Sequence, residues 1–250
     1  MKFYALLVQD PLSLVRKTQV APKVYRIIFA LPRSNDPLGL PTGQHIALQA
    51  KINGESIARS YTPVSNNNDL GRIELLVKVY EGGLMTEHLE KMQIGDTIDI
   101  RGPKGTMEYN QSYARHIGMI AGGTGIAPMY QLVRAICEDT SDKTKVSLIY
   151  ANNSESDILL FEELEGFVKQ CPGKFDVHYV LTKPPVDWKG SKGYVTASMI
   201  SKHLPAPAAD TKILLCGPPM MVNAMKAHLA EIGFEKPSVI SKATDQVFLF

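Results

Sequence analysis

The sequence has few of the features that mark secreted, metal-binding or membrane-spanning proteins. It contains only three cysteines in 250 residues. Cys137, Cys171 and Cys216 lie far apart and form no CxxC pair. An odd and scattered set argues against a disulfide framework and against a structural zinc site, and no other cluster of metal ligands is visible, so we expect no bound metal. A reducing compartment such as the cytosol fits this cysteine usage best.

Long hydrophobic runs are also lacking. The most apolar region, residues 117–133, is interrupted by several glycines and by Pro128, which argues against a membrane span. The N-terminal stretch MKFYALLVQD lacks the length and the small-residue cleavage site of a signal peptide. We therefore expect a soluble, cytoplasmic chain. An N-terminal anchor outside these residues would instead place it on the cytosolic face of the endoplasmic reticulum or of the mitochondrial outer membrane.

Charge of one sign is not in large excess. The formal net charge is +2, with 27 basic and 25 acidic residues, which is too small a bias to indicate nucleic-acid binding. Hydrophobic residues make up 44% and charged residues 21%, as in ordinary globular proteins. The length is sufficient for two domains.

Two halves of the chain show different hydrophobic patterns. Short alternating or β-branched runs at 24–32, 45–52, 72–80 and 96–102 are separated by turn residues and predict an antiparallel β-barrel, with one short helix at 84–92. From residue 116, strand and helix patterns alternate, which predicts a doubly wound parallel sheet covered by helices. The predicted strands are 116–123, 145–152, 175–182, 212–217 and 247–250, and the predicted helices are 126–139, 158–170, 196–204 and 219–233. We place the boundary between domains 1–112 and 113–250.

Two short motifs in the first half can bind an anionic, aromatic ligand. Arg59-Ser60-Tyr61-Thr62-Pro63 combines a cation that can hold a phosphate, a flat ring and a hydroxyl. Gly82-Gly83-Leu84-Met85-Thr86 opens the short helix, where exposed amides and the helix dipole attract anions. The alternatives are an ordinary edge strand and an ordinary glycine turn.

Two motifs in the second half follow predicted strands and precede predicted helices. One is Gly122-Gly123-Thr124-Gly125-Ile126-Ala127-Pro128, at the position where α/β sheets bind a dinucleotide phosphate. The other is Cys216-Gly217-Pro218-Pro219-Met220. Strands at 117–121 and 212–216 are expected to point their carboxyl ends into one crevice. A glycine turn without ligand and a cysteine buried as a small hydrophobe are the alternatives.

Taken in order, these four motifs resemble the ferredoxin–NADP reductase superfamily and, within it, the NADH–cytochrome b5 reductase family of fungal-like type. The resemblance covers nearly the whole chain from Pro11. It is carried by the strings GLPTGQHI (39–46), RSYTPVS (59–65), LVKVYEGGLMTEHL (76–89), MQIGDTIDIRGPKG (92–105), GMIAGGTGIAPM (118–129), YANNSESDILL (150–160), LLCGPPMM (214–221) and DQVFLF (245–250).

The resemblance implies an FAD-binding barrel followed by a nicotinamide-binding domain. The residues that match FAD contacts are Arg59, Tyr61, Thr62, Val77, Lys78, Tyr80, Gly83, Met85 and Thr86. The residues that match the nicotinamide-binding rim are Gly123, Thr124, Gly125, Cys216, Gly217, Pro218 and Met220, with Phe250 near the flavin ring.

The resemblance also implies the reaction. Hydride passes from the nicotinamide to the flavin, and electrons leave singly for a haem protein, cytochrome b5. Thr62, His45 and Cys216 form the candidate catalytic set. We hypothesise a Thr62–His45 proton relay, because histidine titrates near physiological pH. A core histidine without function is the alternative. For Cys216 we expect packing and positioning, not nucleophilic attack.

The chain departs from the family pattern after the third strand of the second domain. Residues 181–184 are Leu-Thr-Lys-Pro, without the acidic residue that favours NADH. Thr182 is still able to bond a ribose, and Lys183 to attract a 2′-phosphate, so we expect NADH use with detectable NADPH use.

Acceptor choice is predicted from charge. Lysines such as Lys78, Lys104 and Lys183 are candidates for steering acidic cytochrome b5, although solvated surface lysines are the alternative. Two further alternatives remain open. One is a related flavin reductase with a nitrate-reductase-type or ferredoxin-type acceptor, and the other is a nucleotide-binding protein without catalysis.

Overall fold

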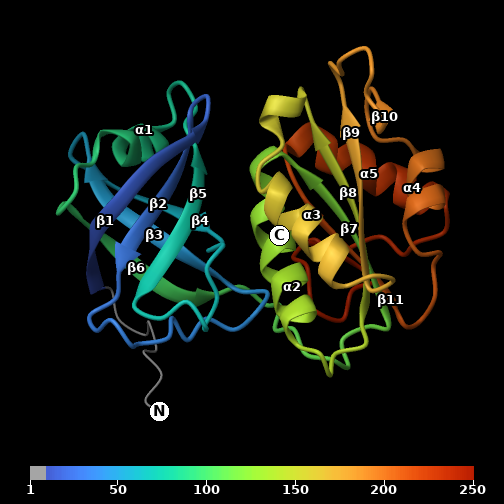
Figure 1. The fold of residues 1–250 in the computed structure, drawn as a ribbon, viewed down its shortest axis with the longest axis horizontal. Coiled ribbons are helices and arrows are strands. Elements are labelled where there is room, and N and C mark those ends of the chain that lie inside the picture. Colours follow the sequence, from blue (N-terminus) through green and yellow to red (C-terminus); the bar gives the residue numbers. More distant parts are fainter. Residues whose placement is uncertain (1–9) are drawn as a thin grey trace. The chain divides into compact units, whose positions relative to one another are not determined.

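The structure, a computed structural model, describes residues 10–250. The N-terminal stretch for which we expect no signal peptide lies outside these residues apart from Asp10. The chain divides into two compact units, the first ending at Glu108 and the second running from Tyr109 to Phe250 (Figure 1). Each unit contains one six-stranded sheet.

The first unit is an antiparallel sheet with the strand order β4-β3-β6-β1-β2-β5. Its elements are β1 (Asp10–Ala21), β2 (Val24–Ala30), β3 (His45–Ile52), β4 (Glu55–Tyr61), β5 (Arg72–Lys78), α1 (Leu84–Lys91) and β6 (Thr97–Lys104). The chain just after β4 bonds to the opposite edge strand, since Val64 N donates to Glu74 O at 2.9 Å. This contact joins the two edges, and the predicted antiparallel barrel is confirmed.

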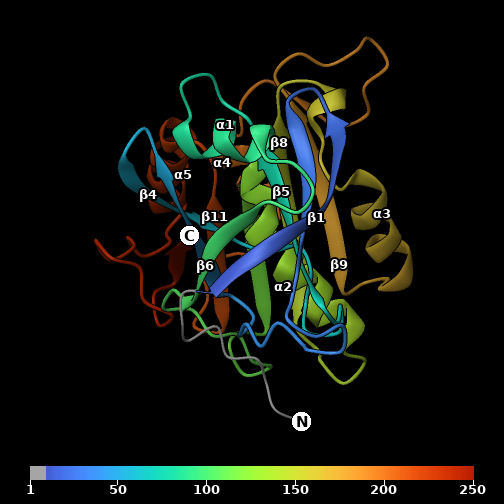
Figure 2. The same cartoon turned by 90° about the vertical axis from the view of Figure 1, so that its left-hand side faces the viewer.

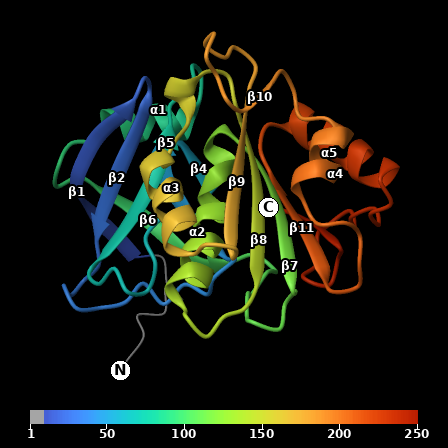
Figure 3. The same ribbon diagram turned by 45° about the vertical axis from the view of Figure 1, so that its right-hand side comes forward.

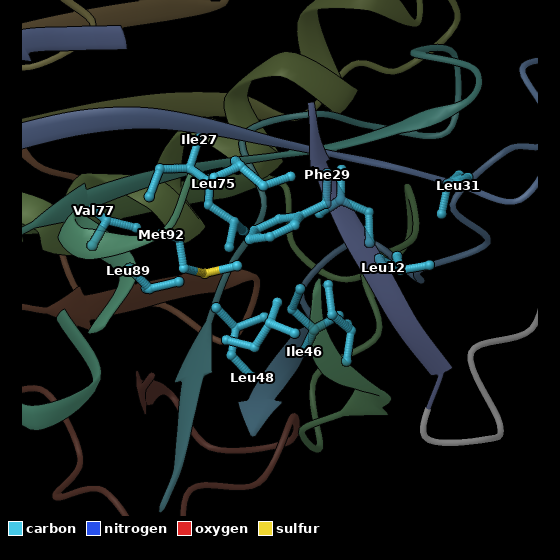
Figure 4. Close-up of a cluster of buried hydrophobic side chains, with 14 of the residues drawn as sticks. Leu12, Ile27, Phe29, Leu31, Ile46, Leu48, Leu75, Val77, Leu89 and Met92 are labelled. Atoms are coloured by element: carbon cyan, nitrogen blue, oxygen red, sulfur yellow. The ribbon is translucent and has the colours of Figure 1, made fainter. Parts of the chain in front are cut away.

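The barrel is held by one continuous hydrophobic core. Figure 4 shows the Phe29 ring among side chains from the other strands, including Ile46, Leu48 and Leu75, each buried to at least 99%. Burial of such side chains contributes about 1.5–3 kcal/mol each. Leu89 of α1 belongs to the same core, which fixes the helix at one end of the strands (Figure 2).

A lysine from β1 also anchors α1. The Lys17 ammonium donates to Glu90 O at 2.6 Å and to Met92 O at 2.5 Å, the carbonyls at the helix C-terminus. A cation there satisfies carbonyls that have no partner inside the helix and is favoured by the helix dipole. The bonds therefore fix the C-terminal end of α1 to β1.

The second unit is a parallel sheet with the order β10-β9-β8-β7-β11-β12. Its strands are β7 (His116–Gly122), β8 (Lys145–Asn152), β9 (Phe175–Leu181), β10 (Ser191–Lys192), β11 (Thr211–Cys216) and β12 (Val247–Leu249). From β7 the chain moves outward through β8 and β9, then returns to place β11 on the other side of β7. The sheet therefore has a topological switch point between β7 and β11.

Helices cover both faces of this sheet, with α2 (Ile126–Glu138) and α3 (Phe161–Gln170) on one face and α4 (Ala197–His203) and α5 (Pro219–Glu231) on the other (Figure 3). Strand residues such as Ile149, Ile213 and Leu215 pack against Ile200 of α4 and Met225 of α5. The predicted doubly wound sheet is confirmed. No helix within residues 10–250 combines the length and hydropathy that a membrane crossing requires.

Most predicted elements agree with the structure to within a few residues, but the helix predicted from residue 158 begins later. A short 3-10 turn, Glu155–Asp157, comes first. The Ser154 and Asp157 side chains cap this turn reciprocally, and Leu160 then adopts a left-handed conformation with φ 58°. Helix α3 starts only at Phe161, because a residue with positive φ cannot continue a right-handed helix.

Candidate functional site

The first group of predicted site residues gathers at the end of β4. Arg59 is exposed, and within residues 10–250 its guanidinium bonds only to Ala58 O, at 2.8 Å. Arg59 and Tyr80 both lie close enough to Tyr61 to influence its pKa. Burial raises the pKa of Tyr61 to about 12, and Arg59 opposes that rise. A cation without a carboxylate partner therefore stands beside two tyrosines.

The N-terminus of α1 adds main-chain amides to this group. Gly83 is the N-cap, and no side chain caps the helix. The Thr86 hydroxyl is turned back to Gly83 O at 3.0 Å and accepts from Tyr80 N at 3.3 Å. A side chain at Gly83 would collide with the Thr86 hydroxyl, at 2.5 Å, and with Tyr80 O, at 2.9 Å. The turn thus keeps open amides that suit a phosphate.

Some predicted flavin contacts have side chains that point elsewhere. Val77 and Met85 are 1% and 2% exposed and belong to the barrel core. Only their main-chain atoms are therefore available to a ligand. Lys78 ends β5 and is half-buried, whereas Tyr80, just beyond the strand, is 53% exposed.

His45 and Thr62 flank the last pair of the β3–β4 ladder. Strands β3 and β4 pair antiparallel, and their ladder ends with Ile46 opposite Tyr61. His45 precedes Ile46 and Thr62 follows Tyr61, and both side chains are half-buried. Burial, and then the nearby charge of Lys104, lower the pKa of His45 below its usual value of 6.5. The imidazole is therefore neutral at pH 7.

The second group lies at the switch point of the parallel sheet. The glycine loop follows β7, and Cys216 ends the neighbouring parallel strand β11, opposite Ala121. A Cβ atom at Gly125 would lie 2.4 Å from Cys216 O and 2.9 Å from Gly217 N. The two loops are thus in main-chain contact, and the predicted convergence of the two strand ends is confirmed. Gly123 has φ 54°, and a Cβ there would meet no atom within 4 Å.

Sequence reasoning missed Tyr150, which supports the glycine loop from β8. Its side chain is fully buried, and its hydroxyl donates to Gly123 O at 3.0 Å and accepts from Leu159 N at 3.3 Å. A buried tyrosine hydroxyl needs a partner, and here the partner is the predicted phosphate loop. A tyrosine inside an apolar strand was the available signal, but the sequence does not identify its partner.

Three predicted residues of the rim differ in exposure. Cys216 is half-buried, and burial raises the pKa of its thiol to about 11, so it is protonated at neutral pH. This agrees with positioning and not with nucleophilic attack. Met220 is 87% exposed at the start of α5, beside Pro218, the N-cap. Phe250 is 37% exposed, and its ring packs edge-on against Phe248, with centroids 5.0 Å apart.

Thr182 follows β9 at the same edge of the sheet. Its hydroxyl donates to Asn153 Oδ1 at 3.2 Å, and Lys183 N donates to Asn153 O at 2.7 Å. Asn153, which sequence reasoning did not single out, therefore joins the ends of β8 and β9. The Lys183 side chain is exposed.

Comparison with known families matches both units. Residues 11–109 match the oxidoreductase FAD-binding domain, and residues 119–227 match the oxidoreductase NAD-binding domain. These two matches follow the order of the two groups of site residues described above.

Individual relatives extend the match along the chain. The chain is 50% identical to NADH-cytochrome b5 reductase 1 of Debaryomyces hansenii, over 95% of this chain and 84% of the relative. It is 51% identical to the protein of that name from Aspergillus terreus, over 95% and 82%. Among solved structures, the cytochrome b5 reductase domain of Ulva prolifera nitrate reductase superposes with a TM-score of 0.91 at 34% identity, covering 100% of both chains.

Proposed function

The chain belongs to the NADH–cytochrome b5 reductase family, and on that basis we propose that it oxidises NADH and reduces cytochrome b5 one electron at a time. It is an FAD-dependent NADH oxidoreductase. The main structural observation in support is the glycine loop at the switch point of the second sheet. There Gly125 lies directly against the Cys216 main chain, so both loops meet at the switch point where α/β sheets bind dinucleotides.

The residues of the first unit fit FAD. Arg59 has a guanidinium free to bond a diphosphate, and Gly83 leaves the N-terminal amides of α1 accessible. Tyr61 and Tyr80 supply aromatic rings for the flavin and its side chain. When bound, FAD supplies the conversion of a two-electron hydride donor into a one-electron source. The chain supplies binding, orientation and exclusion of water.

The second unit is proposed to hold NADH along the carboxyl ends of its strands. Gly123, Thr124 and Gly125 would receive the diphosphate at the start of α2, while Gly217, Pro218 and Met220 form the facing rim. Cys216 would position the nicotinamide as a protonated thiol. Thr182, which follows β9, would contact the adenosine ribose, and Phe250 would contact the ring of the flavin.

Thr62 and His45 are proposed to move the proton that accompanies electron release. The position of both residues at the end of the β3–β4 ladder, on either side of the Ile46–Tyr61 pair, supports this role. A neutral imidazole can accept a proton from a hydroxyl group, and the lowered pKa of His45 keeps that form available at pH 7.

We also propose a reducing cellular compartment, in which the three cysteines remain thiols. Exposed lysines, Lys104 and Lys183 among them, would attract an acidic haem protein. Such steering predicts that the rate of haem reduction falls as ionic strength rises.

An acceptor panel tests the proposal. FAD-loaded protein and NADH are mixed with cytochrome b5, ferricyanide or ferredoxin, and the initial rates are compared. We expect efficient reduction of ferricyanide and of cytochrome b5, with slow reduction of ferredoxin. Fast ferricyanide reduction without cytochrome b5 reduction would instead indicate another haem acceptor, as the likeness to a nitrate reductase domain allows. Failure to bind FAD would favour a non-catalytic nucleotide-binding protein.

Replacing NADH by NADPH in the same assay tests coenzyme preference. No acidic residue stands at 181–184 to repel a 2′-phosphate, and Lys183 is exposed there. We therefore expect slower but measurable turnover with NADPH. A Lys183→Glu substitution should lower the NADPH rate and leave the NADH rate nearly unchanged, whereas a background rate with NADPH in the wild type would refute the expectation.

A further inference from the structure

Two of the three cysteines meet on the helical layer formed by α2 and α3. The two helices lie side by side on one face of the second sheet (Figure 3), and the rings of Tyr130 and Phe167 pack between them with centroids 6.0 Å apart. Further toward the C-terminus of both helices, Cys137 lies in the last turn of α2 and Cys171 caps α3. The two helices are thus in contact at positions N-terminal to both cysteines.

The two thiols are neighbours in this position. The Cys171 Sγ atom donates to Cys137 O at 3.7 Å, so the Cys171 thiol lies against the Cys137 main chain. Burial, and then the contact with Cys171, raise the pKa of the Cys137 thiol. Both side chains are half-buried, and they line a surface pocket of about 340 Å³ together with Gln170 and Lys174. A small polar oxidant can therefore reach the pair.

The surrounding main chain holds both cysteines in place. Cys171 N donates to Phe167 O at 2.9 Å, and Cys171 O accepts from Lys174 N at 3.0 Å. The Lys174 ammonium donates to Ile136 O and, at 3.0 Å, to Asp139 O, which ties the end of α2 to the turn after α3. The pair is therefore fixed from both sides and does not depend on a mobile loop.

We propose that Cys137 and Cys171 form a redox-sensitive pair that hydrogen peroxide converts into an intramolecular disulfide. Because burial raises the pKa of Cys137, Cys171 is the thiol that attacks: its thiolate attacks peroxide, forming a sulfenic acid and releasing hydroxide, which takes up a proton to give water. The second thiol then attacks the sulfenic sulfur, the S–S bond forms, and a second water leaves. Two thiols are oxidised by two electrons and one peroxide is reduced to two waters.

The cross-link would act on the stability of the second unit. It would close a loop of about 35 residues between the ends of α2 and α3, which restricts the unfolded chain. The cross-link would join two helices that are already packed against each other through Tyr130 and Phe167. Oxidation should therefore raise the unfolding temperature of the second unit by roughly 5–10 °C. Helix α2 begins at the glycine loop, and the disulfide would link its C-terminal end to the end of α3.

Mass spectrometry of the oxidised protein tests the pair directly. FAD-loaded wild type is treated with a small excess of hydrogen peroxide, alkylated and digested without reductant. We expect one peptide in which Cys137 and Cys171 are joined, two of the three thiols lost, and Cys216 alkylated. Dithiothreitol should restore both thiols and the original unfolding temperature.

Single variants provide matched controls. Cys137→Ser and Cys171→Ser should each show no stabilisation by peroxide and no internal cross-link. If either variant folds poorly, the wild-type peptide map decides alone. Wild type in which peroxide yields only separate sulfinic acids, intermolecular dimers or a cross-link through Cys216 would overturn the assignment. None of these measurements depends on electron transfer, so this result and that of the acceptor panel are independent.

Discussion

His45 and Thr62 are the two residues of the proposed proton relay. Replacing His45 by alanine removes the base, so we expect cytochrome b5 reduction to slow by about 100-fold or more. The wild-type rate should decline as pH falls below the lowered His45 pKa, and this decline should vanish in the variant. Rates measured from pH 5 to 8 check both expectations.

His228→Ala is a suitable control, because His228 lies on α5 of the second unit and its ring faces Glu231 at 3.7 Å. It should retain the wild-type pH profile. A His45→Ala variant with wild-type turnover and an unchanged profile would refute the relay and leave His45 as a packing residue.

Arg59 has a guanidinium that, within residues 10–250, bonds only to the main-chain carbonyl of Ala58. Arg59→Ala should weaken FAD binding by about 10–100-fold, because charge-assisted hydrogen bonds to a diphosphate would be lost. Arg72→Ala is the matched control, since the Arg72 guanidinium already bonds Asp69 at 3.0 Å. Quenching of FAD fluorescence on titration measures both affinities. Equal affinities in the two variants would place the diphosphate elsewhere.

At the scale of elements, the contact between the loops after β7 and β11 is the tightest feature of the second site. A Gly125→Ala side chain would overlap Cys216 O, so we expect a destabilisation of about 1–3 kcal/mol and a higher KM for NADH. Gly166→Ala, in open space within α3, should instead stabilise the protein by about 0.5–1 kcal/mol. Denaturant unfolding and steady-state kinetics distinguish the two. A tolerated Gly125→Ala with unchanged KM would show that the loops can separate freely.

Helices and strands were predictable where the same repeat of apolar residues runs along the whole element. The apolar run 145–152 and the alternating run 45–52 match β8 and β3 residue for residue. The start of α3 was not predictable in this way, since Ile158 and its two leucine neighbours continue the helical pattern. The reciprocal cap of Ser154 and Asp157 and the positive φ of Leu160 override that pattern.

At the scale of the whole molecule, stability should depend on pH through a pair of stacked histidines. His178 of β9 and His203 of α4 have ring centroids 3.6 Å apart. Burial first, and then neighbouring positive groups including Lys202, lower the pKa of both. Folding therefore favours the neutral forms of both histidines. Their contribution to the free energy of unfolding is fully present above pH 6.5 and is lost as pH falls from 6.5 through the lowered pKa values of the folded state.

Thermal unfolding at pH 7.5 and at pH 5.5 measures this dependence. We expect the unfolding temperature of the wild type to fall by several degrees on acidification. The unfolding temperature of His203→Asn should fall less, because only one of the two stacked rings can then become charged. An unfolding temperature that is independent of pH over this interval would contradict the expected coupling.

The candidate site was predictable as a set of residues but not as an arrangement. Motif order placed Arg59, Gly83 and Gly125 in binding loops. The contact of Gly125 with Cys216 joins segments about 90 residues apart in the chain, and only the parallel pairing of β7 and β11 creates it. The support of Gly123 by Tyr150, and of α1 by Lys17, depends equally on tertiary packing. Such contacts leave no periodic signal in a single sequence.

Anaerobic spectroscopy of the FAD-loaded protein most directly tests whether the chain joins NADH oxidation to haem reduction. One equivalent of NADH is added while flavin absorbance is followed, and oxidised cytochrome b5 is added afterwards. We predict that the visible flavin absorbance bleaches with NADH and returns as two equivalents of cytochrome b5 become reduced. Flavin absorbance that stays unchanged by NADH, in protein shown to hold FAD, would contradict the assignment of this chain as an NADH-dependent electron-transfer enzyme.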